Sequence, residues 1–196
     1  MAQKIRIIAG ALGGRLLEVP EAGTRPFADR VRQALFAILE PRLPDARVLD
    51  LCAGSGAAGL EALSRGAQHV QFVEISRRAT DVIRRNVASL GLAGQTEIQT
   101  SDALASLRAL AARGATFDLI VADPPYDEVP LRSGMLELIA DHQSPLATGG
   151  LLVLSGRRVK GETTQVAPRG LRLVRGLTYG ETAIDLYEHE GAEELR

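Results

Sequence analysis

The stretch VLDLCAGSGAAG, residues 48–59, decides which fold class this chain of 196 residues can adopt. It starts as a short apolar run typical of a buried strand, and it ends in a helical pattern. Between the two, Gly54, Gly56 and Gly59 match the spacing G-x-G-x-x-G. In that spacing the first two glycines allow a tight turn and close approach of a ligand, and the third allows close packing of helix on strand. A tight turn without a ligand fits the same glycines, but the strand–loop–helix context favours a binding loop.

Strands and helices are predicted to alternate after this point. Apolar runs predict strands at residues 47–51, 69–74, 95–100, 117–123 and 150–155. Helical periodicity predicts helices at residues 57–65, 77–90, 103–112 and 131–141. This alternation is typical of an α/β fold with a mostly parallel sheet and helices on both faces. Two final extended runs, 171–174 and 182–187, have no helix between them and are expected to pair antiparallel.

The chain before the glycine stretch has a different pattern. Residues 1–20 predict a small hairpin, because two extended runs flank the turn residues between Gly10 and Gly14. Residues 28–40 predict a helix that ends at Pro41. We therefore expect a hairpin extension at 1–26, a main domain at 27–190 and a tail at 191–196.

Composition excludes several classes of protein. No apolar run approaches the roughly 18 residues of a membrane span, and the N-terminus is a poor signal peptide. One cysteine allows no internal disulfide and fits a reducing compartment, so we expect a cytoplasmic protein. Three histidines and one cysteine leave little for a zinc site, so we expect no metal. The net charge of −1 combines +3 over residues 1–47 with −4 over the remainder, so the first segment is either ordinary solvated surface or a region that meets phosphates.

Three carboxylates are predicted at the ends of successive parallel strands. These are Asp50, Glu74 and Asp102, and they should lie at one edge of the sheet. A carboxylate beside the glycine loop repels a pyrophosphate and attracts a cation. Glu74 can accept hydrogen bonds from a ribose diol, and Asp102 followed by a small residue can accept from an adenine amine. Taken one at a time, each of the three acids could also be a helix-capping or surface residue.

S-adenosylmethionine has all the parts that this array can bind, namely a cationic sulfonium and ammonium head, a ribose and an adenine. The sequence therefore predicts this cofactor rather than a dinucleotide. The candidate cofactor-binding residues are Asp50, Ala53, Gly54, Ser55, Gly56, Glu74, Ile75, Asp102 and Ala103. Cys52 is expected to be a small buried residue without a nucleophilic role.

The second specific signal is Asp123-Pro124-Pro125-Tyr126, which follows the fourth strand of the main domain. An exocyclic amine of a base is a poor nucleophile, because its lone pair is delocalised into the ring. The Asp123 carboxylate and the Pro124 carbonyl can accept both N–H groups of such an amine, and the prolines fix the turn without competing as donors. Tyr126 can stack on the base. We take these four residues as the catalytic candidates, with a rigid loop as the alternative interpretation.

On these residues the chain resembles the RsmD-type methyltransferases of bacterial small-subunit ribosomal RNA, over nearly its whole length. Besides the glycine loop, Glu74 and the Asp-Pro-Pro-Tyr corner, three further segments carry the resemblance. They are Arg25-Pro26 with Asp29-Arg30-Val31-Arg32 and Leu35-Phe36, then Asn86, and finally Tyr179-Gly180-x-Thr182.

The resemblance implies a Rossmann-like class I methyltransferase fold, with a seven-stranded, mostly parallel sheet, an antiparallel last strand and an N-terminal hairpin. It implies methyl transfer from S-adenosylmethionine to the N2 amine of a guanine in 16S ribosomal RNA within an assembling particle, by a monomer without a membrane partner. Arg15, Arg25, Arg30 and Arg32 then become candidate RNA contacts, with pairing to Asp29 or Glu40 as the alternative for Arg30 and Arg32.

The chain departs from the family pattern at three places, and other functions stay open. Phe27-Ala28 stand where family members often have threonines, Tyr126 stands where they often have phenylalanine, and Ser155 stands where the fifth strand often ends in glutamate.

The alternative functions are an adenine-N6 methyltransferase acting on DNA or RNA, a nicotinamide-dependent oxidoreductase, and an RNA-binding assembly factor without activity. A sequence-specific DNA methyltransferase would need a sizeable target-recognition domain, which we do not expect in this chain. A nicotinamide-dependent oxidoreductase would leave Asp50 and the Asp-Pro-Pro-Tyr corner unexplained.

Overall fold

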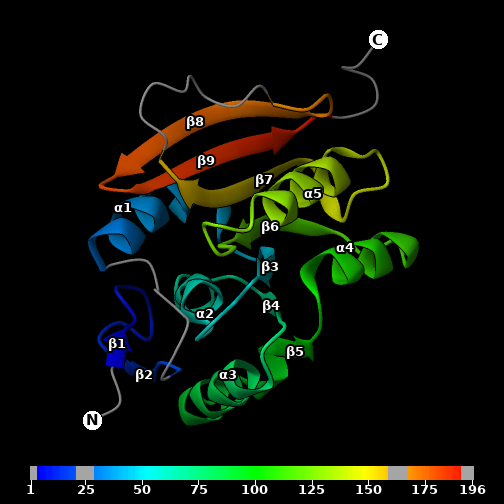
Figure 1. Ribbon diagram of the computed structural model, residues 1–196. Coiled ribbons are helices and arrows are strands. Elements are labelled where there is room, and N and C mark those ends of the chain that lie inside the picture. Colours follow the sequence, from blue (N-terminus) through cyan, green and yellow to red (C-terminus); the bar gives the residue numbers. More distant parts are fainter. Residues whose placement is uncertain (1–3, 21–28, 159–166, 191–196) are drawn as a thin grey trace. The chain divides into compact units, whose positions relative to one another are not determined.

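The computed structural model describes residues 4–20, 29–158 and 167–190 (Figure 1). The chain forms two compact units, residues 1–102 and 103–196. The expected boundary between residues 26 and 27 and the expected tail at 191–196 lie outside the described residues, so these domain limits stay predictions. None of the described helices is long and apolar enough to cross a membrane.

The first unit contains three parallel strands and the helices that connect them. Strand β3 pairs with β4, and β4 pairs with β5, all in parallel. Helices α2 and α3 pack on these strands, and the short strands β1 and β2 pair antiparallel as a separate hairpin. In order, the elements are β1 Lys4–Arg6, β2 Leu16–Glu18, α1 Asp29–Leu39, η1 Glu40–Arg42, β3 Arg47–Leu51, α2 Ala57–Ser64, β4 His69–Glu74, α3 Arg77–Leu90, η2 Ala93–Gln95 and β5 Thr96–Thr100.

The second unit is built around four strands. Strand β6 pairs with β7 in parallel, and β9 lies between β7 and β8 and is antiparallel to both. Its elements are α4 Ala103–Ala112, β6 Phe117–Ala122, α5 Val129–Ala140, β7 Leu146–Arg157, β8 Leu171–Tyr179 and β9 Thr182–His189.

The strand order of the sheet is β5-β4-β3-β6-β7-β9-β8. This order confirms the predicted seven-stranded, mostly parallel sheet with an antiparallel last strand, and the separate hairpin is confirmed as well. Strands β7, β8 and β9 are longer than predicted, and the difference is largest for β7 and β8. Strand β7 runs on through Gly156 and Arg157, and β8 runs to Tyr179, because each keeps pairing with β9 beyond its apolar core.

Helix α3 shows how the local sequence fixes an element of the first unit. Ser76 caps its first turn, since the Ser76 hydroxyl accepts a hydrogen bond from the Ala79 amide. Gly91 ends the helix with φ of +73°, a conformation that glycine adopts without steric cost. The buried stripe of the helix includes Val82, Ile83 and Asn86. The helix is therefore fixed at both ends, and its buried side carries a polar residue.

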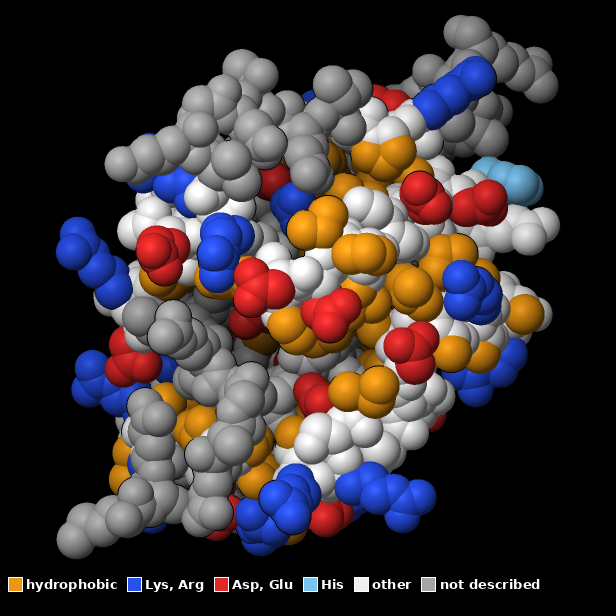
Figure 2. Space-filling view, viewed as in Figure 1, with side chains coloured by type: hydrophobic (Ala, Val, Ile, Leu, Met, Phe, Trp, Pro, Cys, Tyr) orange, Lys and Arg blue, Asp and Glu red, His pale blue; other side chains and the backbone are white. Residues whose placement is uncertain are grey.

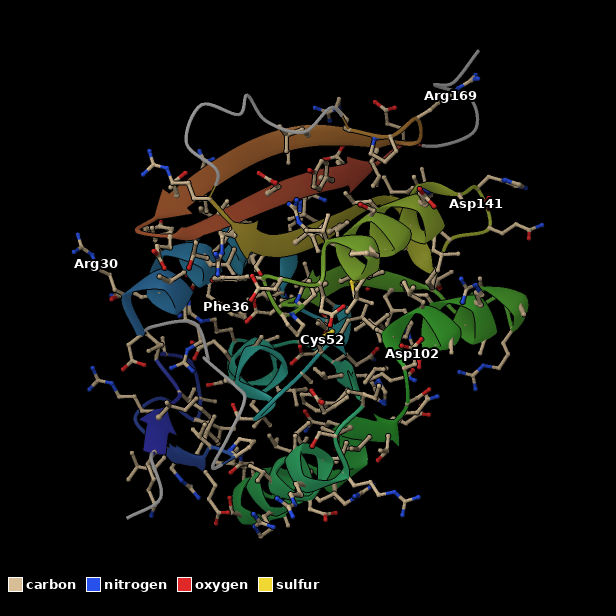
Figure 3. The ribbon with its side chains drawn as sticks, viewed as in Figure 1. Arg30, Phe36, Cys52, Asp102, Asp141 and Arg169 are labelled. Carbon is tan, nitrogen blue, oxygen red and sulfur yellow. The ribbon has the colours of Figure 1, made fainter. Side chains whose placement is uncertain are left out.

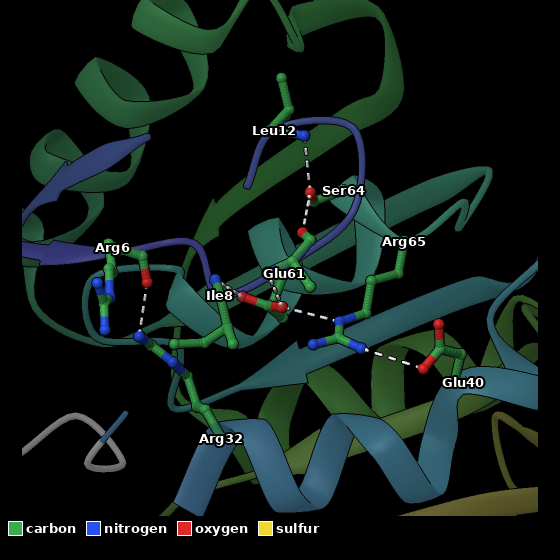
Figure 4. A network of polar contacts seen from close by, with 9 residues as sticks. Arg6, Ile8, Leu12, Arg32, Glu40, Glu61, Ser64 and Arg65 are labelled. Carbon is green, nitrogen blue, oxygen red and sulfur yellow. Dashed lines mark hydrogen bonds and ion pairs between the residues drawn. The ribbon is translucent and has the colours of Figure 1, made fainter. Parts of the chain in front are cut away.

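Buried side chains of α2 fasten the N-terminal hairpin (Figure 4). The carboxylate of Glu61, which is fully buried, accepts hydrogen bonds from the amides of Ile8 and Ala9 at 2.6 and 3.1 Å. The same carboxylate pairs with the guanidinium of Arg65 at 2.8 Å. The Ser64 hydroxyl accepts from the Leu12 amide. The loop of the hairpin therefore depends on groups 52 to 55 residues away in the chain.

Replacing Glu61 with alanine should destabilise the protein strongly. The change leaves two amides and the buried Arg65 without their carboxylate partner, and we expect a loss of about 3 kcal/mol or more in the free energy of unfolding. Glu40→Ala is the matched control, because Glu40 pairs with the same arginine from an exposed position and should cost under about 1 kcal/mol. Urea denaturation measures both variants, and equal losses would contradict the role of Glu61.

Candidate active site

The glycine loop of the first unit joins β3 to α2 through a tight turn. The backbone at Gly54 and Gly56 has φ of +57° and +77°, a region that favours glycine. A Cβ atom at Gly59 would lie 2.6 Å from Val70 Cγ1 and would overlap the ring of Phe72. The expected roles of these glycines in the turn and in helix–strand packing are therefore confirmed.

Cys52, just before this loop, differs from expectation. It is half-buried rather than fully buried, and its φ of +57° is unusual for a residue with a side chain. The conformation shows that the tight turn already begins at the end of β3.

Glu74 connects the glycine loop to the end of β4. Its buried carboxylate accepts hydrogen bonds from the amides of Gly54 and Ser76, each at 2.9 Å. A carboxylate offers about four acceptor positions, so further positions remain for two hydroxyl groups of a ligand. Ile75 is 70 % exposed directly beside it and offers an apolar surface to a planar ring. Glu74 thus orders the loop and keeps the capacity to accept from a diol.

The other two strand-end acids have different surroundings. Asp50 is buried, and its carboxylate accepts a hydrogen bond from the Gly59 amide at 2.9 Å in the first turn of α2. Asp102 is exposed after β5 (Figure 3), and the next residue, Ala103, begins α4. The Ser101 amide donates to the Glu74 carbonyl, which brings the chain just before Asp102 to the end of β4.

Asn86 is a loop-positioning residue for which the sequence predicted no role. Its amide nitrogen donates to the carbonyl of Ser55 in the glycine loop and to the carbonyl of Glu18 in β2. Its side-chain oxygen accepts from the Glu18 amide. One buried amide therefore links the loop, α3 and the hairpin, and its helical position facing the core was the signal available in the sequence.

The Asp-Pro-Pro-Tyr corner lies in the second unit, directly after β6. The Ser155 hydroxyl donates a hydrogen bond to one oxygen of the Asp123 carboxylate. Burial raises the pKa of Asp123 to about 6, and the hydrogen bond from Ser155 opposes this rise. Pro124 is buried and Pro125 is exposed, so the corner turns from the interior to the surface. Asp123 is thus a carboxylate that titrates near neutrality, at the end of a strand.

The remainder of the corner is held by β9 and β7. The Tyr126 hydroxyl lies 2.6 Å from the Thr182 hydroxyl at the start of β9. Asp127 pairs with Arg157 at 3.3 Å on the surface. Sequence reasoning gave no role to Ser155 or Thr182. The signal was strand register, because Ala122 pairs with Leu154 and the next residues on the two strands are Asp123 and Ser155.

The predicted RNA-contact arginines are placed in different ways. Arg15 is exposed and donates to the Ser89 carbonyl, and Arg30 points away from α1 into solvent (Figure 3). Arg25 lies outside the described residues. Arg32 requires a correction: its side chain is 1 % exposed, and its guanidinium donates to the Arg6 carbonyl and to Asp29. In this position Arg32 stabilises the hairpin, and its guanidinium is not accessible to an RNA phosphate.

Helix α3 adds exposed cations that the sequence analysis did not single out. Figure 2 shows Lys and Arg side chains over α3, along the lower edge of the view. The exposed arginines of this helix are Arg77, Arg78, Arg84 and Arg85. Two of them pair with exposed acids, Arg84 with Asp81 and Arg85 with Glu18. Within the described part of the chain, no group of His, Cys, Asp and Glu is arranged to hold a metal ion.

Comparisons with known proteins define the class. A family model described as "Conserved hypothetical protein 95" matches residues 5–188. The structure of yhhF from Escherichia coli, a proposed methyltransferase, superposes with a TM-score of 0.82 and 35 % identity over 96 % of this chain and 99 % of that chain. A hypothetical protein of Thermus thermophilus gives a TM-score of 0.78 and 33 % identity, with coverage of 94 % and 99 %. The fold is that of class I methyltransferases, whose methyl donor is S-adenosylmethionine.

Sequence relatives identify the family within this class. The chain is 37 % identical to the ribosomal RNA small subunit methyltransferase D of Escherichia coli strain K12, over 97 % of this chain and 93 % of the relative. The relative of the same name in Haemophilus influenzae is 30 % identical, with coverage of 95 % and 94 %. The chain belongs to this family, so the resemblance stated from its motifs is confirmed.

Proposed function

We propose that this protein transfers a methyl group from S-adenosylmethionine to the exocyclic N2 amine of a guanine in 16S ribosomal RNA. The observation that carries the proposal is the position of Asp123, which follows β6 and precedes Pro-Pro-Tyr. One oxygen of its carboxylate accepts a hydrogen bond from Ser155. The names of the relatives, which methylate ribosomal RNA of the small subunit, support the substrate.

In this proposal the acceptor amine donates its two hydrogens to the Asp123 carboxylate and the Pro124 carbonyl. These bonds favour a pyramidal nitrogen whose lone pair points at the methyl carbon. Bound S-adenosylmethionine would supply the methyl group: the C–S bond would break as the N–C bond forms, and the electron pair would remain on sulfur in a neutral thioether. The surplus proton of the amine leaves to Asp123 or to water. The protein mainly aligns the reactants and excludes water from them.

The cofactor is assigned to the end of the parallel strands in the first unit. The backbone of the loop from Ala53 to Gly56 would approach the cofactor closely, and Glu74 would accept the ribose hydroxyls. Asp50 would attract the cationic head, although its helix-capping bond to Gly59 is already a structural role. Ile75, Asp102 and Ala103 would surround the adenine.

We propose that exposed arginines of the first unit contact the RNA partner. Exposed Arg15, Arg30 and the four arginines of α3 offer positive charge to phosphates. We propose that the substrate is an assembling small-subunit particle in the cytoplasm and that the protein acts as a monomer.

Methyl transfer should rise with pH between about 5 and 7, because Asp123 must be ionised to accept hydrogens from the amine. Its pKa of about 6 places the midpoint of this rise, with the protonated carboxyl inactive below it. Single-turnover rates across this range measure the effect. A midpoint near 4, the ordinary range of aspartate, would argue against a buried catalytic carboxylate.

The proposed function is tested in cells of the source organism that lack this protein. Mass mapping of their small-subunit RNA should show the loss of one methyl group on the N2 of a guanine, and the methyl should return when the protein is supplied. Loss of a methyl from an adenine amine would overturn the base assignment. Unchanged RNA would overturn the proposal as a whole.

A further inference from the structure

Ser155 lies near the carboxyl end of β7, where β9 pairs with its backbone and β6 pairs with the preceding residue. Strand β7 pairs with β6 in parallel up to Leu154, and it pairs with β9 through Ser155 and Gly156. The Ser155 side chain is fully buried, and its hydroxyl donates its hydrogen to one oxygen of Asp123. A hydroxyl has a single hydrogen, so Ser155 can donate to only one of the two carboxylate oxygens of Asp123.

A half-buried ion pair holds the Ser155 backbone from the other side. The Ser155 carbonyl accepts a hydrogen bond from Arg132 Nε at 3.2 Å, and Arg132 in turn pairs with Asp185 on β9 at 2.8 Å. The arginine fits because residue 156 is glycine, since a Cβ atom there would lie 3.0 Å from Arg132 Nε. Helix α5 and strand β9 therefore restrain Ser155, and the hydroxyl is oriented before any ligand binds.

We propose that Ser155 is a positioning residue of the acceptor site, whose hydroxyl fixes one oxygen of the Asp123 carboxylate and leaves the other oxygen for the acceptor amine. The inference rests on the proposed function for the identity of that amine. Ser155 itself makes no contact with the reacting atoms, because its only hydrogen is engaged by Asp123.

The hydrogen bond also has an electrostatic consequence. It stabilises the ionised form of Asp123 and so opposes the rise in pKa caused by burial. On the neighbouring elements of this unit, Arg132 pairs with Asp185 and Arg157 pairs with Asp127, Glu188 of β9 pairs with Arg172, and Asp118 of β6 and Glu137 of α5 are exposed. Burial raises the pKa of Tyr187 to about 12, so this tyrosine stays neutral. Removal of the Ser155 hydroxyl should therefore raise the pKa of Asp123 further.

The test compares Ser155→Ala with the wild-type protein by two readouts. A carboxyl ¹³C NMR titration of aspartate-labelled protein, with Asp123 assigned from the Asp123→Asn variant, should show the midpoint moving up by about one pH unit. The acidic limb of the methyl-transfer rate should move by the same amount, while the affinity for S-adenosylmethionine stays unchanged.

Ser106→Ala is the matched control, because Ser106 is a buried hydroxyl of the same unit without a hydrogen-bond partner among the described residues. It should leave both midpoints unchanged. An Asp123 midpoint that is the same in wild type and Ser155→Ala overturns the inference. Because the NMR titration needs no turnover, a moved midpoint without methyl transfer to RNA would overturn the proposed function and leave the Asp123–Ser155 coupling established.

Discussion

Substitution of Asp123 by alanine should lower the rate of methyl transfer by about 10³-fold while S-adenosylmethionine binds with unchanged affinity. In the proposed function this carboxylate accepts hydrogens from the amine, so its loss would remove an interaction made in the transition state. Transfer of labelled methyl from the cofactor to small-subunit particles measures the rate, and calorimetry measures cofactor binding.

Asp127→Ala provides the control for this variant. Asp127 lies on the same loop four residues later, with 88 % of its side chain exposed and a surface pair with Arg157. Exposed pairs of this kind contribute little, so transfer should continue at close to the wild-type rate. The assignment of Asp123 would fail if Asp123→Ala and Asp127→Ala transferred methyl equally fast.

Substitution of Glu74 by alanine should have the opposite signature. We expect the dissociation constant for S-adenosylmethionine to rise about 100-fold, because the carboxylate holds the amides of Gly54 and Ser76 and would accept the ribose hydroxyls. At saturating cofactor the transfer rate should largely recover, since we propose that Glu74 contributes to cofactor binding and does not contact the amine.

The control for Glu74 is Glu97→Ala, which removes an exposed acid from the neighbouring strand β5. Its cofactor affinity should equal that of the wild type. Unchanged affinity in Glu74→Ala would contradict the assignment of the glycine-loop edge to the cofactor.

Local patterns explain why much of the fold could be predicted from the sequence. The alternation of apolar strands and helices and the spacing of Gly54, Gly56 and Gly59 act over a few residues, and their consequences appear in the structure. The lengths of β7 and β8 could not be predicted in the same way. They depend on pairing with β9, which lies far along the chain.

The supports of the candidate site could not be predicted from local patterns. Ser155, Thr182 and Asn86 reach their partners over sequence separations of 32, 56 and 31 residues. Such contacts depend on strand register and on helix orientation, and neither follows from composition. The sequence marked Ser155 only as a departure from the family pattern.

Arg32 shows how a charge count can mislead. The excess of basic residues in the N-terminal segment makes it a candidate RNA contact, yet its side chain is buried against the hairpin. Helical spacing contained the correct signal, because Arg32 precedes the buried Leu35, Phe36 and Leu39 by three, four and seven positions. The position of a charged residue on a helix therefore predicts its exposure better than the number of charged residues in the segment does.

The most direct measurement of methyl transfer to guanine N2 uses the purified protein, methyl-labelled S-adenosylmethionine and small-subunit particles whose RNA lacks this modification. After digestion of the RNA to nucleosides, we expect the label in N2-methylguanosine, and we expect no label when Asp123→Ala replaces the wild type. Label in another nucleoside, or transfer that persists without the Asp123 carboxylate, would contradict this expectation.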